Sequence, residues 1–455
     1  MNHAPHFLIA LVCLTACAGP DDSWPYHSTS VQDTDTDTDT DTDTDTDTDT
    51  DTDTDTDTDT DSQALQELVS AWDAANLSIY DGMGYTGFSN REAILSQNED
   101  AILEAILEMY RATGDVAYLH LFVEHADLVL SWRDDNAGFV DYNGESNPVW
   151  SDAYDQYVEG GNAYPFLLES GQLTWPLADF AQLVLNDASL KIKDAGDGRT
   201  LFSVAMDYVT AAEETLSFHH ENWHTDTLEI DGEFIEVGWF SAQADADFLI
   251  GIPAGGMLPI NHQTSMGRTV AALYAATGST SHADRAMRMA RWVILELEKD
   301  DNGAMLWHYW PEMDYPTKNG YTDYVDNGGY DGYEDFSHAI LTAEFAHAVV
   351  EAGLGVWDAG DLDAFERTFR QNLYTGNPGV FNLFVDGTYP KNRPTDRYQS
   401  GRFLRLASYG ANPAEHYEIA RYTLLDDLAI HEPGQIGGAT GLLSLAELIR
   451  FWDLQ

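Results

Sequence analysis

The feature that most restricts the fold of this chain is a motif that occurs twice, in which one helical pattern ends at a glycine and a second follows. Residues 110–114 read Tyr-Arg-Ala-Thr-Gly, and residues 274–278 read Tyr-Ala-Ala-Thr-Gly. A glycine at this position is typical of a helix C-cap. A second amphipathic segment follows each glycine, Ala117 to Trp132 in one copy and Ala283 to Leu297 in the other. Each copy therefore predicts a helical hairpin.

Three further pairs of amphipathic segments follow this pattern more loosely, and one more segment lies at each end. The pairs are Leu177 to Leu185 with Phe202 to Trp223, Phe336 to Ala352 with Ala364 to Leu373, and Phe403 to Tyr409 with Glu415 to Leu425. The terminal segments are Gln63 to Ala74 and Leu442 to Trp452. An unpaired apolar helix would expose hydrophobic surface, so we expect these two to pack together. The sequence thus predicts an all-α (α/α)6 toroid of six hairpins.

Four long connections separate the hairpins, whereas the turn inside each hairpin is short. They span roughly residues 134–174, 224–260, 300–334 and 374–400. Loops of this length are usually functional. In a toroid the first helices of all hairpins run parallel. We therefore expect the connections, with short β elements, to gather on one face and to form the site there.

The hairpin pattern resembles the (α/α)6 toroid group of carbohydrate-active proteins. This group includes six-hairpin glycosidases, toroid polysaccharide lyases and the helical domain of glucuronyl epimerases. The resemblance covers almost all of residues 62–455. It implies sugar chemistry as the class of function, although a fold alone does not determine an activity.

The charge of the chain limits its partners. The 78 acidic residues outnumber the 21 basic ones, which gives a formal net charge of −57. The first 61 residues hold 17 of the aspartates and no Lys or Arg, so residues 62–455 still carry −40. A surface of this sign repels phosphate and excludes nucleic acid as a partner. The only cysteines, Cys13 and Cys17, precede the folded region, which therefore has neither a disulfide nor a thiolate metal site.

An apolar run from Phe7 to Leu14 is too short to span a bilayer and leads into Leu14-Thr15-Ala16-Cys17. This box resembles a bacterial lipoprotein signal. The resemblance implies that residues 1–16 are a signal peptide and that Cys17 is lipidated and anchors the protein to a membrane. Because Ala18 follows the cysteine, it implies an outer-membrane lipoprotein of the bacterial cell envelope, surface exposed or periplasmic. No Lys or Arg precedes the apolar run, and a plain secretory signal is the alternative.

Residues 33–61 form an uninterrupted Asp-Thr alternation with 15 aspartates and no hydrophobic residue. Such a segment cannot enter a core, and repulsion between its like charges extends it. Residues 17–61 are therefore predicted to be a disordered acidic tether, whose repeat reaches on the order of 100 Å at full extension. Loose calcium binding by the aspartates is the alternative. The toroid domain then occupies residues 62–455.

Aromatic side chains crowd the connections. They are Trp150, Tyr154, Tyr157 and Tyr164 in the first, Trp239 in the second, and Trp307, Tyr309, Trp310, Tyr315, Tyr321, Tyr324, Tyr330 and Tyr333 in the third. Exposed rings can stack on the apolar faces of sugars. On this interpretation Trp307, Trp310 and Tyr164 bind substrate. The alternative is that the rings pack the connections onto the toroid.

A basic cluster stands out in this acidic chain. It consists of Lys391, Arg393, Arg397, Arg402 and Arg405, with only Asp396 opposing it between positions 391 and 405. The planar guanidinium group suits carboxylate or sulfate. Arg393, Arg397 and Arg402 are therefore candidate ligands for an anionic polysaccharide. Salt bridges to neighbouring acidic loops are the alternative.

Asn261 and His262 open the helical segment that ends at Gly278. Toroid alginate lyases carry a similar Asn-His pair at the start of an inner helix. This resemblance implies that Asn261 neutralises a uronate carboxylate, that His262 removes the proton at C5, and that Tyr309 or Tyr315 protonates the leaving oxygen. The alternative is an ordinary N-cap at Asn261 and a satisfied loop histidine at His262.

Carboxylates near the connections point to hydrolysis instead. Glu334-Asp335-Phe336-Ser337-His338 opens the next inner helix, and His338 should face the same cavity as His262. Glu169 lies in the connection that precedes the second inner helix. A glycoside hydrolase needs two carboxyl groups, one protonated and one ionised, and Glu169 with Asp335 would supply them. A helix cap at Asp335 is the alternative.

Two patterns bear on metals. His220-Glu221-Asn222-Trp223-His224 matches the zincin motif, in which two histidines four residues apart on a helix bind zinc, and Glu229 or Glu236 could be a third ligand. Asp326, Asp331, Glu334 and Asp335 form a candidate calcium site without EF-hand spacing.

The sequence therefore predicts a tethered carbohydrate-active protein that acts on an anionic, uronate-type polysaccharide. We expect β-elimination first and hydrolysis by paired carboxylates second, without a resident cofactor. A non-catalytic glycan-binding lipoprotein and a zinc-dependent hydrolase using His220 and His224 are the remaining alternatives.

Overall fold

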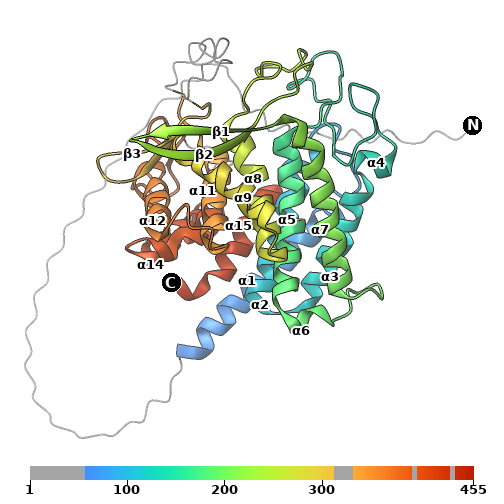
Figure 1. Ribbon diagram of the computed structural model, residues 1–455. Coiled ribbons are helices and arrows are strands. Elements are labelled where there is room, and N and C mark those ends of the chain that lie inside the picture. The colour runs from blue at the N-terminus through green and yellow to red at the C-terminus, as the bar shows by residue number, and fades with distance from the viewer. Residues whose placement is uncertain (1–56, 312–331, 392–396, 431–435) are drawn as a thin grey trace, which may run out of the picture. The chain divides into compact units, whose positions relative to one another are not determined.

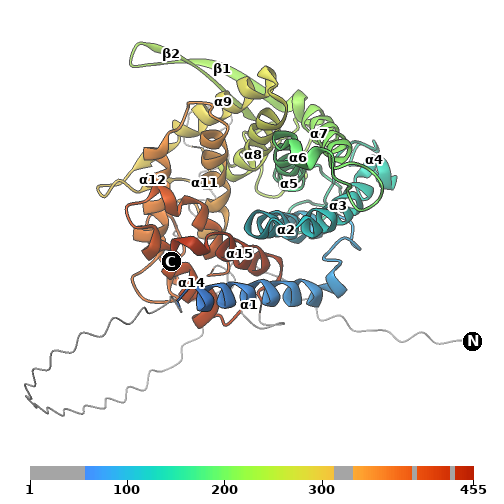
Figure 2. The same cartoon turned by 90° about the horizontal axis from the view of Figure 1, so that it is seen from below.

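Six helices form an inner ring in the part of the chain that the computed structural model describes, residues 57–311, 332–391, 397–430 and 436–455 (Figures 1 and 2). Each inner helix packs against the next, and the last packs against the first, so the ring is closed. In chain order the inner helices are α2 (Asp100–Thr113), α5 (Leu167–Asn186), α8 (Ile260–Thr277), α11 (Phe336–Glu351), the 3-10 helix η5 (Ser400–Tyr409) and α15 (Gly438–Arg450).

An outer helix pairs with each inner one (Figure 2). The outer helices are α1 (Asp57–Ser78), α3 (Val116–Ser131), α7 (Leu201–Phe218), α9 (Thr280–Ile294), α12 (Ala359–Arg367) and α14 (Pro413–Arg421). The short helices are α4 (Asp134–Ala137), α6 (Ala188–Lys191), η1 (Tyr80–Gly82), η2 (Leu95–Glu99), η3 (His219–Asn222), η4 (Thr368–Leu373), η6 (Tyr422–Asp427) and η7 (Trp452–Leu454). This arrangement confirms the predicted (α/α)6 toroid.

The first and last long helices close the ring, as the sequence predicts. Helix α1 packs against α15. The indole Nε1 of Trp72 donates a hydrogen bond to the carbonyl oxygen of Leu442 (3.1 Å), and Trp72 is buried. The glycine caps are also confirmed, because Gly114 and Gly278 take positive φ (69° and 70°) and donate to Tyr110 and Tyr274.

The described strands form three antiparallel two-stranded ribbons. Strand β1 (Trp223–Ile230) pairs with β2 (Glu233–Phe240), β3 (Leu297–Lys299) with β4 (Met305–Trp307), and β5 (Phe381–Asn382) with β6 (Pro390–Lys391). In the first ribbon Trp223 lies opposite Phe240. Its two-residue turn, Asp231 and Gly232, has positive φ at both positions (52° and 85°), which matches the twist of the strands.

The long connections lie together, because backbone hydrogen bonds join each to the next. Ile250 N donates to Tyr157 O (2.9 Å) between the first and second, and Ile260 N donates to Tyr309 O (3.1 Å) between the second and third. Val385 N donates to Glu334 O (3.0 Å) between the third and fourth. The expectation that they gather on one face is therefore confirmed (Figure 1).

Several element boundaries differ from the prediction. Helix α5 begins at Leu167, inside the predicted first connection, and continues through Pro176. The packing of α5 against α2, α7 and α8 outweighs the cost of the backbone hydrogen bond that Pro176 cannot donate. Helix α7 ends at Phe218, because Trp223 starts a strand. Helix α1 begins at Asp57, within the predicted tether. The predicted α-helix Phe403 to Tyr409 belongs to a 3-10 helix.

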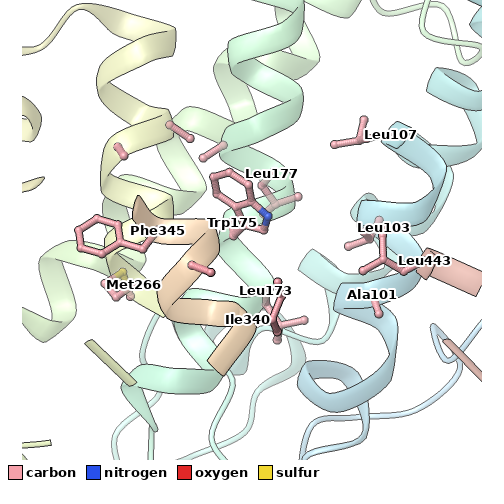
Figure 3. Packing of buried hydrophobic residues seen from close by; sticks show 14 of the residues in the cluster. Ala101, Leu103, Leu107, Leu173, Trp175, Leu177, Met266, Ile340, Phe345 and Leu443 are labelled. Carbon is pink, nitrogen blue, oxygen red and sulfur yellow. The ribbon is translucent and has the colours of Figure 1, made fainter. Parts of the chain in front are cut away.

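The core lies between the inner and outer helices and between neighbouring inner helices. Figure 3 shows part of it, built from α2, α5, α8, α11 and α15 by the buried side chains Leu103, Leu107, Leu173, Trp175, Leu177, Met266, Ile340, Phe345 and Leu443. Helices α5 and α8 approach closely at Gly171. A Cβ atom there would lie 2.5 Å from the backbone nitrogen of Met266 and 2.6 Å from the carbonyl carbon of Ser265.

We predict that Gly171→Ala lowers the free energy of unfolding by about 1–3 kcal/mol, although alanine favours a helix, because the added methyl group meets backbone atoms that cannot yield. Gly87→Ala is the control, since a Cβ atom there meets nothing within 4 Å. Urea unfolding followed by circular dichroism measures both. Equal stability of the two variants would contradict the close approach of α5 and α8.

Candidate active site at the starts of the inner helices

Polar side chains that are buried collect around the first turns of four consecutive inner helices. The first turn of α2 carries Asp100, that of α5 carries Glu169, and α8 begins with Ile260 followed by Asn261 and His262. Glu334 directly precedes the N-cap of α11, and it is buried like the others. The first turns of α5, α8 and α11 follow the connections that gather on one face. This end of the ring is therefore the candidate active site.

Glu169 belongs to a buried pair of carboxyl groups. Asn90 Nδ2 donates a hydrogen bond to Glu169 Oε2 (2.7 Å), and the carboxyl group of Asp152 lies close enough to that of Glu169 to raise its pKa. Asp152 Oδ1 also accepts the backbone N–H of Tyr154 (2.8 Å). Two neighbouring carboxyl groups that are both removed from water disfavour a second negative charge, so one of them tends to keep its proton. The prediction that Glu169 lies in a connection is wrong, since it lies in a helix whose start the sequence did not show.

Burial and charge together keep a proton on this pair. Burial raises the pKa of Glu169 well above its ordinary range, and the negative charge of Asp152 raises it further. Burial also raises the pKa of Asp152, to about 6, although the backbone N–H of Tyr154 favours the charged form. Glu169, whose pKa is raised both by burial and by a neighbouring like charge, is thus the member of the pair that we expect to keep the proton.

Tyr157 borders this pair. Gln97 Nε2 donates to the Tyr157 hydroxyl oxygen (3.3 Å). Burial raises the pKa of Tyr157, and the charges of Glu169 and Asp152 add to this effect, which places the hydroxyl group near both carboxyl groups. Tyr157 itself is half-buried.

The start of α11 holds a second group of carboxylates. Asp335 is the N-cap, and its Oδ1 accepts the backbone N–H groups of Ser337 (2.9 Å) and His338 (3.2 Å). The alternative of a helix cap is therefore confirmed. Its Oδ2 also bonds to His338 Nδ1 (2.6 Å). Burial raises the pKa of Asp335, but the charge of His338 and its hydrogen bonds outweigh this and hold it at about 2.

Glu334 lies beside this cap and is fully buried. Neither of its side-chain oxygen atoms has a hydrogen-bond partner in the described part of the chain. Its Oε1 is 3.8 Å from His338 Nδ1. Burial raises the pKa of Glu334 well above its ordinary range. Glu334, Asp335 and His338 are the one set of three His, Cys, Asp or Glu side chains among the described residues whose ligand atoms all lie within 4.8 Å of one another.

The Asn-His pair lies at the start of α8 but is buried. The N-cap of this helix is Pro259, so the alternative of an N-cap at Asn261 is wrong. Asn261 Oδ1 accepts the backbone N–H of His262 (3.0 Å). Burial lowers the pKa of His262 to about 3, and the charge of His338 contributes. The charge of His338 thus reaches His262, and both histidines lie in the first turns of inner helices at the same end of the ring.

Aromatic side chains from the third connection complete this region. The ring centroid of Tyr309 lies 5.8 Å from that of His338 and 5.3 Å from that of Trp310. Both Tyr309 and Trp310 are half-buried. The structure thus brings Tyr309, Trp310, His262 and His338 together at one end of the ring.

Two of the aromatic residues expected to bind sugar are instead part of the packing. Trp307 has 1% of its surface exposed and packs on Phe365, and Tyr164 has 4% exposed and packs on Phe166. The alternative of connections packed onto the toroid by their aromatic residues is therefore correct for these two rings. They lie too deep to stack on a sugar.

The described arginines of the basic cluster do not face a ligand. Arg397 pairs with Asp427 and donates to Gly379 O (2.9 Å). Arg402 is buried, and its Nη2 donates to both oxygens of Glu344 (2.9 Å each). The prediction that these guanidinium groups receive an anionic polysaccharide is therefore wrong, because buried carboxylates already hold them.

Arg402 belongs to an ionic network inside the ring that the sequence analysis missed. Glu344 of α11 also accepts from Arg268 of α8, and Arg268 lies 3.3 Å from Glu104 of α2. Because α2 and α8 are not neighbours in the ring, these contacts cross its interior. Glu104 and Arg268 each lie six residues before the tyrosine of the repeated motif, and this shared position was a signal available from the sequence.

The zincin pattern does not lie on one helix. His220 is in the 3-10 helix η3 and His224 is in β1, because α7 ends at Phe218. His220 Nδ1 accepts from Arg285 Nη2 (3.0 Å), and His224 Nε2 bonds to Ser241 Oγ (2.8 Å). The spacing of four residues brings two histidines onto one face only in a helix. The zinc-dependent alternative that uses this motif is therefore wrong.

Asp100 was not singled out from the sequence. It is buried, and its Oδ1 has no hydrogen-bond partner among the described residues. Burial raises its pKa to about 8, and the charge of Glu104 contributes. An acidic residue in the first turn of an amphipathic helix usually faces solvent. The burial of Asp100 follows from the closure of the ring and could not be predicted from the sequence.

Some predicted residues lie outside the described ranges. They are Arg393, Tyr315, Tyr321, Tyr324, Tyr330, Asp326, Asp331 and Cys17. Among the residues that are described, no helix has both the length and the apolar character needed to cross a membrane.

Comparisons with known proteins address the fold. No protein-family model and no curated protein matches the chain. The chain is similar to the solved structure of an alpha-1,6-mannanase from Salegentibacter sp. HEL1_6, with 11% identity and a TM-score of 0.48, over 86% of this chain and 99% of that one. It is also similar to an inactive variant of that enzyme in complex with alpha-1,6-mannotriose, with 12% identity and a TM-score of 0.47, over the same shares.

We predict that Arg402→Ala lowers the free energy of unfolding by about 3 kcal/mol, because Glu344 loses its two-point partner inside the ring. Arg288→Ala is the control, since Arg288 pairs with the exposed carboxylates of Asp284 and Glu236, and its loss should cost less than about 1 kcal/mol. Urea unfolding of both variants measures this difference. If both variants lose equally little free energy of unfolding, the ionic network does not stabilise the ring.

Proposed function

We propose that this protein is a glycoside hydrolase that cleaves a polysaccharide, with Glu169 as the proton donor. The observation that carries this proposal is the buried Glu169 and Asp152 pair at the start of α5. Cleavage of a glycosidic bond requires a carboxyl group that is still protonated at the working pH and can protonate the leaving oxygen. Burial and the neighbouring carboxylate give Glu169 this property.

A second group must activate the attacking water. The start of α11 contributes Asp335 and His338, whose side chains are hydrogen-bonded (2.6 Å). In its neutral form, an imidazole oriented by a carboxylate can accept a proton from water. Helices α5 and α11 both pack against α8, so Glu169 and this pair lie at the same end of the ring on either side of the α8 start.

Hydrolysis suits the site better than the β-elimination first inferred from the sequence. Elimination requires a neutralising group and a base that both reach the uronate. Asn261 and His262 are buried (0% and 6% exposed), and the Asn261 carbonyl oxygen is bonded within its own helix start. Burial alone does not separate the two mechanisms, because Glu169 is buried as well, but elimination would leave the protonated carboxyl pair of Glu169 and Asp152 without a role.

The charges favour a neutral polysaccharide as the substrate. Arg397 and Arg402 are paired with carboxylates, and residues 62–455 carry a net charge of −40. A uronate polymer approaching such a surface would be repelled. A neutral polymer meets no such barrier and can stack on half-buried rings such as Tyr309 and Trp310.

The location of this activity remains a prediction from the sequence. The Leu14 to Cys17 box and the Asp-Thr repeat would place the ring on a long acidic tether at the bacterial outer membrane. Tethering would keep the enzyme close to polymers at the cell surface.

We predict that Glu169→Gln lowers turnover by about 10²–10⁴-fold while polysaccharide binding is retained, because the amide keeps the shape but cannot give up a proton. The assay records reducing ends and ultraviolet absorbance with α-mannan, β-glucan and xylan, and with alginate and pectate. The wild type should produce reducing ends without absorbance from a neutral polymer. Glu159→Gln, an exposed carboxylate of the same connection, should be as active as the wild type.

Three results would contradict this proposal. Products that absorb ultraviolet light would instead support elimination through Asn261, His262 and Tyr309. Retention on a polysaccharide column without any product would leave a glycan-binding protein. A Glu169→Gln variant with full activity would remove Glu169 from the mechanism.

We predict that activity falls as the pH rises through the raised pKa of Glu169, because only the protonated form can act as the acid. Asp152→Asn removes the negative charge that helps to raise this pKa, so the alkaline limb of the pH profile of kcat/KM should move to lower pH. Asp155→Asn, an exposed carboxylate nearby, should leave the profile unchanged. An unchanged profile in Asp152→Asn would contradict the coupling of the pair.

A further inference from the structure

We propose that Glu334, Asp335 and His338 hold a divalent first-row transition ion such as Zn²⁺ or Mn²⁺. The three side chains come from the end of the third connection and the first turn of α11. They bring two carboxylates and one imidazole to one place, with ligand atoms within 4.8 Å of one another. This site differs from the zincin motif, and it shares Glu334 and Asp335 with the calcium cluster that the sequence suggested but adds His338.

The distances between the ligand atoms suit one ion. His338 Nδ1 lies 2.6 Å from Asp335 Oδ2 and 3.8 Å from Glu334 Oε1. Ligand atoms about 2.1 Å from a tetrahedral ion lie roughly 3.4 Å apart. Small side-chain rotations would therefore bring the three groups into coordination. Asp335 Oδ1 keeps its bonds to the backbone of α11 and fixes the position of the carboxylate.

Glu334 independently indicates a ligand. It is fully buried, and both of its oxygen atoms lack a hydrogen-bond partner among the described residues. A buried carboxylate without partners is costly, whether it loses solvation as an anion or keeps an unsatisfied O–H group. A bound cation would satisfy both oxygens.

The ligand types select the class of ion. Ca²⁺ prefers six to eight oxygen ligands, whereas this site offers one nitrogen and two carboxylates. Imidazole together with carboxylate suits Zn²⁺, Mn²⁺ or Fe²⁺. Three protein ligands also leave a coordination position for water, as in catalytic sites.

The role of such an ion, unlike its binding, rests on the proposed function. A cation at the start of α11 would lower the pKa of a bound water at the same end of the ring as Glu169. The water-activating group of the hydrolase would then be the ion together with its three ligands.

Metal binding to the full-length chain tests this site directly. The protein is stripped with a chelating resin, dialysed against Zn²⁺, Mn²⁺ or Ca²⁺, and analysed by mass spectrometry of the bound metal. Glu334→Gln and His338→Ala should each bind one equivalent of Zn²⁺ or Mn²⁺ less than the wild type. Weak binding by the Asp-Thr repeat is common to all variants and cancels in this difference. Glu418→Gln, which alters an exposed carboxylate of α14, is the control.

A second readout reports the ligands themselves. Co²⁺ bound to imidazole should give a visible absorption band in the wild type that is lost in His338→Ala, a half-exposed position where folding is easily checked by circular dichroism. Equal stoichiometry in all variants, with no Co²⁺ band, would overturn the proposal. Hydrolysis by the stripped chain would show that the ion takes no part in the mechanism, while the proposed hydrolase activity would stand. Metal binding without hydrolysis would support the metal site and contradict the proposed hydrolase activity.

Discussion

The paired charges inside the ring are the constraint on which the rest of the structure depends. Glu344 holds Arg268 and Arg402, while Arg405 pairs with Glu447 and Arg111 with Asp179, so every inner helix contributes. A buried charge is tolerated only when its partner is in reach. Each inner helix must therefore adopt the rotation about its axis, and the position along that axis, which complete these pairs. The same constraints fix where the first turn of the helix lies.

This use of charge also shapes the surface. Arg111, Arg268, Arg402, Arg405 and Arg450 are among only 21 basic residues, and all of them pair with carboxylates of the inner helices. The remaining surface is left strongly acidic. Self-repulsion of such a surface is screened by salt, and it disfavours anionic polymers. Arg402 belongs to the basic cluster that first suggested an anionic substrate. Because it is paired inside the ring, it does not offset the acidic surface, and we expect a neutral substrate instead.

The candidate site contains two groups of carboxyl side chains that lack enough cationic partners. At α5 the problem is solved by a proton, which Glu169 retains between Asp152 and Asn90. At α11 Asp335 is compensated by its cap and by His338, but Glu334 is not compensated by any described residue. The proton donor and the cation ligand that we propose both follow from the same physical situation, a carboxyl group removed from water.

Features that depend on neighbouring residues could be predicted from the sequence, including the hairpins, the glycine caps at Gly114 and Gly278, and the cap at Asp335. Closure of the ring also followed, because terminal apolar helices have to be covered. The site itself could not be derived in this way. Arg402 meets Glu344 across 58 positions, Asp152 meets Glu169 only because a connection folds back onto α5, and a strand interrupts the zincin spacing. The sequence by itself determined the helices and their pairing, since helical periodicity and caps are local. Only the tertiary structure decided which charges are buried and paired, because burial depends on residues that the closed ring brings together from distant parts of the chain.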